Sequence, residues 1–328
     1  MMRVSSIKAA LLLAGLAAAQ SAFAVDWKVN LNSHSPYDKS VDGVYAGSFT
    51  YGGQTYGPST AVQPPNGPAV TQHTVDLGKF AAYKIHNAAP VKAQDNDKTK
   101  LGNNGSAGND SNVVYRIYRQ RYSGVIANVT KLKSDGTKYK NRNFVKHIVG
   151  ENTKLAALPR SGRFNYRGVA FTNFPEGQFN YQIDLASKRG KGSFTLNNLL
   201  VPAAWIAQAQ KGSSLAALND GKNKFINIAG TLREAPIVAN RNGTLGVTDG
   251  KVDVRGTTNT TQGALSITNA TAAKEAYELV AKNHKEDQYD KLNPRYTLNV
   301  YGPRGEEVAG FVNGLPDRIG GVAIIGKR

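Results

Sequence analysis

The chain lacks cysteine and has only two methionines and two tryptophans among 328 residues. Without cysteine it can form no disulfide bond, no thiolate metal site and no cysteine nucleophile. It also has no residue that could carry the lipid of a bacterial lipoprotein, so we expect no membrane anchor. No run after the N-terminal segment approaches the ~20 apolar residues that a membrane-spanning helix requires.

The first 24 residues have the pattern of a secretory signal peptide. Arg3 and Lys8 make the start basic, an apolar run follows from Ala9 to Ala19, and Ala22-Phe23-Ala24 fits a cleavage site. We therefore expect residues 1–24 to be a signal peptide that is removed after Ala24. The mature protein would then pass through the periplasm and be secreted into the extracellular space.

The net charge of +18 falls to +16 (18 − 2) when the two signal-peptide cations are removed. A basic exported protein favours an anionic partner, such as an acidic protein, a carboxylate ligand or lipopolysaccharide, and a merely soluble basic surface explains the charge equally well. No nucleic-acid-binding module is recognisable, so we expect no nucleic acid partner.

Short alternating runs bounded by Gly, Asn, Asp and Pro dominate the chain and indicate an all-β protein. One such run places Phe179, Tyr181, Ile183 and Leu185 on one face and Asn180, Gln182 and Asp184 on the other. Paired turn residues at 52–53 and 135–136 predict hairpins, and a further break is expected at Ser123-Gly124. Helices are predicted only over 201–210 and 270–284, as insertions between strands.

Several ordered motifs resemble a known family. They are YRIYRQRYSGVIANV (115–129), GRFNYRGVAF (162–171), GQFNYQIDLASKRGKGSF (177–194) and YGPRGEEVAGFVNGLPDRIGGVAIIGKR (301–328). Together they are similar to the C-terminal barrel of factor H binding protein and to the barrels of transferrin-binding protein B. Related proteins exported through the surface lipoprotein assembly modulator share this barrel, and they include the hemophilins, which are soluble haemophores.

The resemblance implies an eight-stranded antiparallel β-barrel over residues 156–328, preceded by a β-rich handle domain over residues 25–155 that binds the ligand. A closed barrel leaves no unpaired edge, so its last strand must pair with an earlier one. We expect one of Glu306 and Glu307 to face solvent and the other to lie at the wet end of a strand, before Val308 and Phe311 turn inward.

Haem is the ligand that the hemophilin resemblance implies, and the histidines set the candidate residues. None of the five forms a zinc-binding pair, whereas haem needs only one or two axial side chains. Three precede the barrel, and we expect His73 or His86 to ligate the iron, with His34 as a further candidate. Tyr37 and Tyr83 are secondary candidates for cofactor binding, as are Tyr45, Tyr51 and Tyr56. His147 and His284 are expected to be structural or exposed.

The leading hypothesis is a haemophore that captures haem and delivers it to a TonB-dependent outer-membrane haem receptor, after export through a channel of the surface lipoprotein assembly modulator type. The alternative is a secreted binder of a host protein, of the transferrin or complement-regulator type, or a host-colonisation factor whose barrel is an export signal. We expect no enzyme, because no nucleophile elbow or phosphate loop occurs and the adjacent carboxylates Glu306 and Glu307 point to opposite strand faces.

Overall fold

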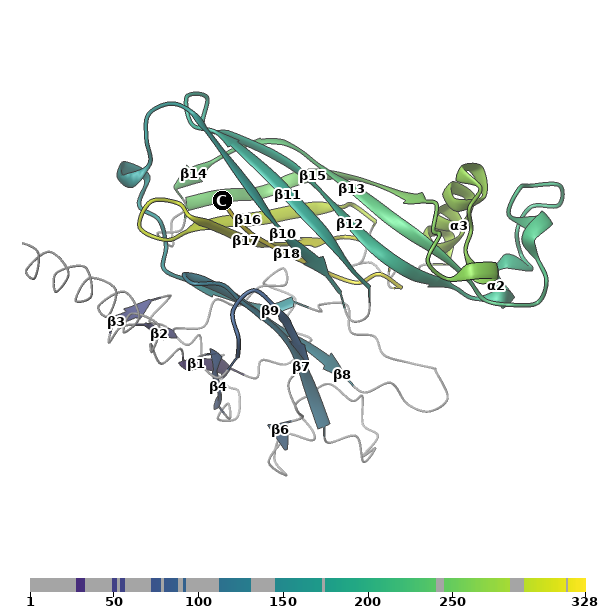
Figure 1. Cartoon of the computed structure of the whole chain (residues 1–328), viewed down its shortest axis with the longest axis horizontal. Helices are drawn as coiled ribbons and strands as arrows, with labels where there is room; N and C mark the ends of the chain where they lie inside the picture. The colour runs from purple at the N-terminus through teal and green to yellow at the C-terminus, as the bar shows by residue number, and fades with distance from the viewer. Residues whose placement is uncertain are drawn as a thin grey trace, which may run out of the picture.

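The computed structural model describes most of the second half of the chain and selected segments of the first (Figure 1). The described residues are 28–32, 49–51, 54–56, 72–77, 80–87, 91–92, 112–130, 145–172, 175–239, 245–283, 292–316 and 318–328. Several residues named above lie outside these ranges, namely His34, Tyr37, Tyr45, His284 and the hairpin predicted at 135–136.

A closed eight-stranded antiparallel barrel forms the C-terminal region, as predicted. Its strands are β10 (Arg163–Phe171), β11 (Glu176–Asp184), β12 (Arg189–Val201), β13 (Lys224–Pro236), β15 (Leu245–Thr257), β16 (Arg295–Tyr301), β17 (Glu307–Asn313) and β18 (Val322–Lys327). Each strand pairs with the next barrel strand along the chain, and β18 returns to pair with β10 from Arg167↔Lys327 to Phe171↔Ala323. The short β14 (Val238–Ala239) pairs only with the start of β15.

Two small sheets precede the barrel. The first contains β1 (Lys28–Asn32), β2 (Phe49–Tyr51), β3 (Gln54–Tyr56) and β4 (Gln72–Asp76). The second contains β5 (Ile85–Asn87), β6 (Val91–Lys92), β7 (Asn112–Arg119), β8 (Ser123–Thr130) and β9 (Val145–Gly150). β2 and β3 pair directly on either side of residues 52–53, in agreement with the predicted hairpin.

The helices lie mainly at one end of the barrel (Figure 1). They are η3 (Leu155–Ala157), α2 (Ala203–Ile206), η4 (Ala216–Leu218), η5 (Gly263–Leu265) and α3 (Ala270–Lys282). α2 is shorter than predicted because Val201 belongs to β12 and Pro202 is still extended at the N-cap. α3 follows the predicted range, and the Asn269 side chain caps it by accepting a hydrogen bond from the Ala272 N–H at 2.9 Å.

The barrel interior is filled by aromatic and aliphatic side chains, and the apolar side of α3 continues this core at one end. Glycines make room for the largest rings on neighbouring strands. A Cβ at Gly230 would lie 2.1 Å from the Phe194 ring, and one at Gly250 would lie 2.1 Å from the Tyr296 ring. The interior therefore fills as a packed core that tolerates little change in side-chain volume.

A second apolar cluster lies outside the barrel, where the sheet of β7–β9 packs on β10, β17 and β18. Its members are Tyr118, Val125, Ala127 and Ile148 from the sheet, and Phe171, Tyr301, Ala309, Phe311, Ala323 and Ile325 from the barrel. The expectation that Val308 and Phe311 both turn inward is therefore wrong for Phe311. Residues three apart on a strand face opposite sides, so Val308 enters the interior and Phe311 enters the outer cluster.

Ile324 and Ile325 test this division, because both are buried on β18 but belong to different clusters. Ile324→Asp should abolish cooperative unfolding of the whole barrel, since a buried carboxylate without a partner costs about 3 kcal/mol or more. Ile325→Asp should leave a cooperative barrel transition and expose β7–β9 to proteolysis. Thermal melting and limited proteolysis of both variants check this, and identical behaviour of the two would contradict the assignment.

Candidate functional site

A polar wall covers the outer surface of β10–β13 and β15. We define the polar wall as the outward side chains of Arg163, Asn165, Arg167, Asn180, Gln182, Asp184, Arg189, Lys191, Ser193, Thr195, Thr231, Arg233, Glu234, Lys251, Asp253 and Arg255, all exposed or half-buried. Apart from the adjacent Arg233 and Glu234, they alternate with core residues along β10–β13 and β15, because successive side chains of a strand point to opposite faces.

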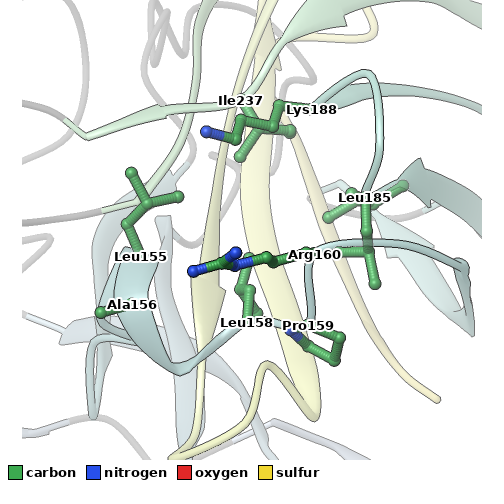
Figure 2. A pocket seen from close by; sticks show the side chains of 9 residues that line it. Leu155, Ala156, Leu158, Pro159, Arg160, Leu185, Lys188 and Ile237 are labelled. Atoms are coloured by element: carbon green, nitrogen blue, oxygen red, sulfur yellow. The ribbon is translucent and has the colours of Figure 1, made fainter.

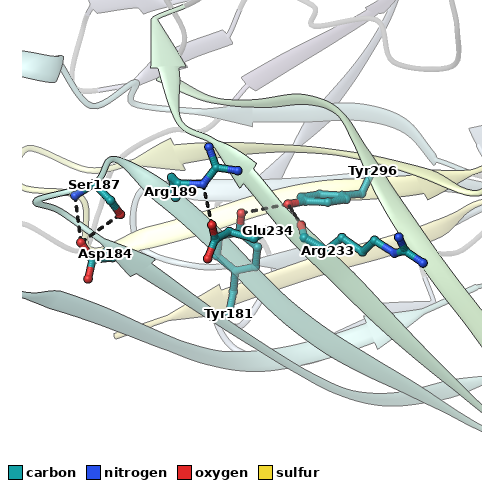
Figure 3. Close-up of polar contacts among 7 residues, drawn as sticks. All are labelled: Tyr181, Asp184, Ser187, Arg189, Arg233, Glu234 and Tyr296. Carbon is teal, nitrogen blue, oxygen red and sulfur yellow. Dashed lines mark hydrogen bonds and ion pairs between the residues drawn. The ribbon is translucent and has the colours of Figure 1, made fainter.

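Three ion pairs neutralise all three acidic residues of the polar wall. They join Arg163 to Asp184 at 3.6 Å, Arg189 to Glu234 at 2.5 Å, and Arg233 to Asp253 at 2.6 Å (Figure 3 shows the second). The Arg233 guanidinium contacts both carboxylate oxygens of Asp253 and holds the pKa of that carboxyl below its usual range. Such exposed ion pairs contribute little to the free energy of unfolding. They do neutralise the three carboxylates, so the remaining cations of the wall have no acidic wall residue to pair with.

The wall carries seven cations and three anions, a net charge of +4 (7 − 3). Arg167, Lys191, Lys251 and Arg255 make no ion pair with any residue in the described part of the chain. These four cations give the wall a positive potential that an acidic partner surface would complement.

A pair of tyrosine side chains inside the barrel hydrogen-bonds to the backbone of a strand that carries the wall (Figure 3). The Tyr181 and Tyr296 hydroxyls lie 3.3 Å apart, and the Tyr296 hydroxyl donates to the Arg233 carbonyl oxygen at 2.9 Å. Burial raises the pKa of Tyr181. The Arg233 backbone is thus held from the interior while its side chain binds Asp253 outside, which limits how far β13 can move.

The wall approaches the size of one side of a protein interface. Five neighbouring strands spaced about 4.8 Å apart span about 20 Å, and nine residues of a strand rise about 30 Å, which gives a face of roughly 600 Å². A standard protein interface takes about 800 Å² from each partner. The wall therefore supplies about three quarters of that area, and an interface of standard size would also include residues at its borders.

Glu307 lies on the opposite side of the barrel, and the expectation that each glutamate of this pair faces solvent or a wet strand end is wrong for Glu307, which is buried. Its carboxylate is buried beneath the β7–β8 turn, where it accepts hydrogen bonds from the N–H groups of Arg121 and Tyr122 at 2.9 Å and the Ser123 hydroxyl at 2.8 Å. Burial raises its pKa to about 7. Glu307 does point away from the barrel interior, but the N-terminal sheet covers that side. Glu306 is half-buried and accepts from the Arg304 N–H.

Two more polar contacts join the N-terminal sheet to the barrel. The buried Arg116 guanidinium donates to the Thr172 carbonyl, pairs with Glu176 and lies 5.5 Å from the centre of the Phe171 ring. The Gln120 side chain donates to the Gly326 carbonyl at 3.1 Å. The sheet is therefore fixed to the barrel at several points, which leaves the polar wall as the broad uncovered face of the described barrel.

The structure describes the side chains of two of the predicted haem residues, His86 and Tyr83, and each has its own contacts. His86 bonds the Ala81 carbonyl through Nε2 at 2.9 Å, and its ring centre lies 5.4 Å from that of Phe80. Tyr83 has a positive φ of 65° and packs beneath the Lys327 ammonium, 3.7 Å from the ring centre. His73 lies in β4 opposite Leu31, and His147 in β9 opposite Ile126.

Among the described residues, no group of three or more His, Asp or Glu side chains is arranged to hold a metal ion. His34 and Tyr37 lie outside those residues, so the haem site stays a prediction. Sequence reasoning overlooked the polar wall as a site, although the alternation of Asn180, Gln182 and Asp184 with buried residues was the signal for it.

The fold and the wall together define a β-barrel protein with a broad polar face on one side and an attached sheet on the other. The sequence profile of the family described as "Factor H binding protein, C-terminal" matches residues 156–233. The matched segment comprises η3, β10, β11, β12 and most of β13, the strands that carry most of the polar wall.

Similar solved structures include two mutant forms of the vaccine antigen transferrin-binding protein B from Haemophilus parasuis Hp5. The double mutant is 11% identical with a TM-score of 0.29, over 86% of this chain and 50% of that chain. The single mutant is 11% identical with a TM-score of 0.32, over 92% of this chain and 45% of that chain. This chain thus spans about half the length of those proteins.

Glu307 generates a pH prediction. Its carboxyl binds a proton more tightly in the folded protein (pKa about 7) than when exposed (4.5), so the free energy of unfolding should fall as pH rises from about 4.5 to about 7 and level off above. The change is about 3 kcal/mol. Urea unfolding at several pH values should show this component in the native protein and not in Glu307→Gln. A parallel pH profile of the two proteins would contradict the assignment.

Proposed function

We propose that this protein is an exported bacterial binding protein whose polar wall binds a host protein. The observation that carries the proposal is the coincidence of the factor H binding protein match with the strands that form the wall. The name of the matched family makes a complement regulator of the factor H type the first candidate partner. Transferrin, which the sequence resemblance also implies, is the second.

The surface chemistry supports a protein partner better than a small ligand at this place. The wall is a broad array of amide, hydroxyl and guanidinium groups, which can hydrogen-bond a partner directly or through water. Arginine is enriched at protein interfaces because its planar donors and aliphatic stem serve both polar and apolar contacts. The excess of four unmatched cations favours a partner with an acidic patch and would accelerate association at low salt.

A host protein can be bound only if this protein is exported from the bacterial cell. The signal-peptide pattern of residues 1–24 and the barrel resemblance support passage through the periplasm and display or release outside the cell. A channel of the surface lipoprotein assembly modulator type is the proposed route. Capture of haem by the N-terminal region remains a separate hypothesis, because no described contact favours it.

Charge reversal on the wall tests the proposed interface. We expect a triple variant to associate with factor H or transferrin about tenfold more slowly or worse, because electrostatic attraction to an acidic partner becomes repulsion. The variant combines Arg167→Glu, Lys191→Glu and Arg255→Glu. Surface plasmon resonance at two salt concentrations measures this, and the native rate should fall as salt rises.

A matched control reverses the same number of charges elsewhere on the barrel. The control variant changes three exposed lysines near the helical end and should leave binding unchanged. It combines Lys211→Glu, Lys222→Glu and Lys282→Glu. Binding that survives the wall variant, or that fails equally in the control, would contradict the wall as the interface. If the native protein binds neither plasma protein at micromolar concentration, the proposed function is wrong.

A haemin titration tests the competing hypothesis. If residues before the barrel hold haem, the native protein should shift the Soret band of haemin, and combined His34→Ala, His73→Ala and His86→Ala should remove the shift. Under the function proposed above, we expect no saturable shift in either protein. A shift that depends on these histidines would restore the haemophore hypothesis.

A further inference from the structure

An apolar cavity of about 480 Å³ opens beside Ile237, at the β14 end of the barrel, which lies opposite α3 (Figure 1 and Figure 2). One side is the segment 155–160, which connects β9 to β10, and the other is the turn between β11 and β12 together with Ile237. Leu155, Leu158, Leu185 and Ile237 supply most of its apolar lining. Its volume falls within the range of about 300–1,000 Å³ that is typical of small-molecule sites.

Two cations flank this cavity, and none of the described residues that line it is acidic. In Figure 2, the Arg160 guanidinium and the Lys188 ammonium extend toward the same side, in the direction of Leu155. Neither cation has an ion-pair partner in the described part of the chain. The nearby Asp184 is already occupied, because it accepts from Ser187 N–H and Oγ and pairs with Arg163.

The backbone holds this arrangement in place. Lys188 has a φ of 52°, which is uncommon for a residue with a side chain, and its carbonyl accepts the Ile237 N–H at 2.8 Å. Leu158 packs against the barrel core, and its N–H donates to the Leu155 carbonyl at 3.2 Å. The cavity is thus built from elements fixed to the barrel.

The apolar lining is incompletely covered in the free protein. Leu155 is 41% exposed, one of three large apolar side chains exposed to this degree among the described residues. An occupant with an aliphatic chain would remove this surface from water, and a negatively charged head group would meet Arg160 and Lys188. A neutral or cationic head group would leave both cations unmatched.

We propose that this cavity binds a free fatty acid, with the aliphatic chain against Leu155, Leu158, Leu185 and Ile237 and the carboxylate between Arg160 and Lys188. The cavity borders the polar wall at Asp184 and Arg189 but shares no lining residue with it, so the proposal does not depend on the partner proposed above. Chain length and head-group charge are the two properties that the cavity selects.

Isothermal titration of the full mature protein with dodecanoate, below its micelle concentration, tests the site directly. We expect saturable binding of one dodecanoate per chain. Octanoate should bind more weakly, by about fourfold for each methylene that is no longer buried. Dodecyltrimethylammonium, which has the same chain and the opposite charge, should not bind at this site.

Three variants connect the binding to the cavity. Ala156→Trp places a large ring at an exposed lining position and should abolish dodecanoate binding while the melting temperature stays native. Combined Arg160→Gln and Lys188→Gln should weaken binding about tenfold. The charge-matched control, Lys211→Gln with Lys222→Gln near the helical end, should bind like the native protein.

Several results would overturn the proposal. These are the absence of saturable dodecanoate binding, equal binding of the cationic amphiphile, and binding that Ala156→Trp leaves unchanged. Flotation with phosphatidylglycerol vesicles that depends on Arg160 and Lys188, without binding of free dodecanoate, would assign the cavity to a membrane lipid instead. Loss of dodecanoate binding in the wall variant Arg167→Glu, Lys191→Glu, Arg255→Glu would contradict the separation of the two sites.

Discussion

The pairing of β18 with β10 is the constraint on which the rest of the structure depends. It closes the barrel, so that every barrel strand has a neighbour on both sides and the aromatic interior is sealed from water. It also forms the outer surface on which Phe171, Ala323 and Ile325 meet the N-terminal sheet. Packing inside the barrel and packing of the N-terminal sheet outside it therefore both depend on the β10–β18 pairing.

The position of the N-terminal sheet determines which barrel face is available for binding. Glu307, Arg116 and Gln120 bind the sheet on the side of β10, β17 and β18, where a buried carboxylate and a buried guanidinium each find several partners. On the opposite side, core and polar residues alternate over most of the strand length. One side of a single barrel thus serves for assembly, and the other is free to meet a partner.

Sequence patterns predicted the barrel well because alternation reports burial on one face. In β11, Phe179, Tyr181 and Ile183 are buried and the residues between them are not, as the pattern indicates. The patterns did not show that β17 and β18 are buried on both faces. Their near-continuous apolar runs were the available signal, since strands covered on both faces lose alternation.

The environment of single charged residues was beyond sequence reasoning. Glu307 has a neighbour of the same type and lies in a turn-rich stretch, which suggests exposure, yet its partners come from residues 121–123. The wall likewise combines segments from β10 to β15 whose adjacency follows only from strand register, and the cavity adds the segment 155–160, which packs on them. A pattern along the chain gives the direction of a side chain, whereas the covering element is set by tertiary packing.

The β10–β18 pairing also affects how the barrel responds to a pulling force. Because Arg167 pairs with Lys327, the segment that leads into β10 and the segment that leaves β18 lie at the same end of an antiparallel pair. A force that separates those two segments would break the inter-strand hydrogen bonds one after another, rather than load them all at once in shear. The barrel should therefore resist pulling along most directions and open at low force along this one.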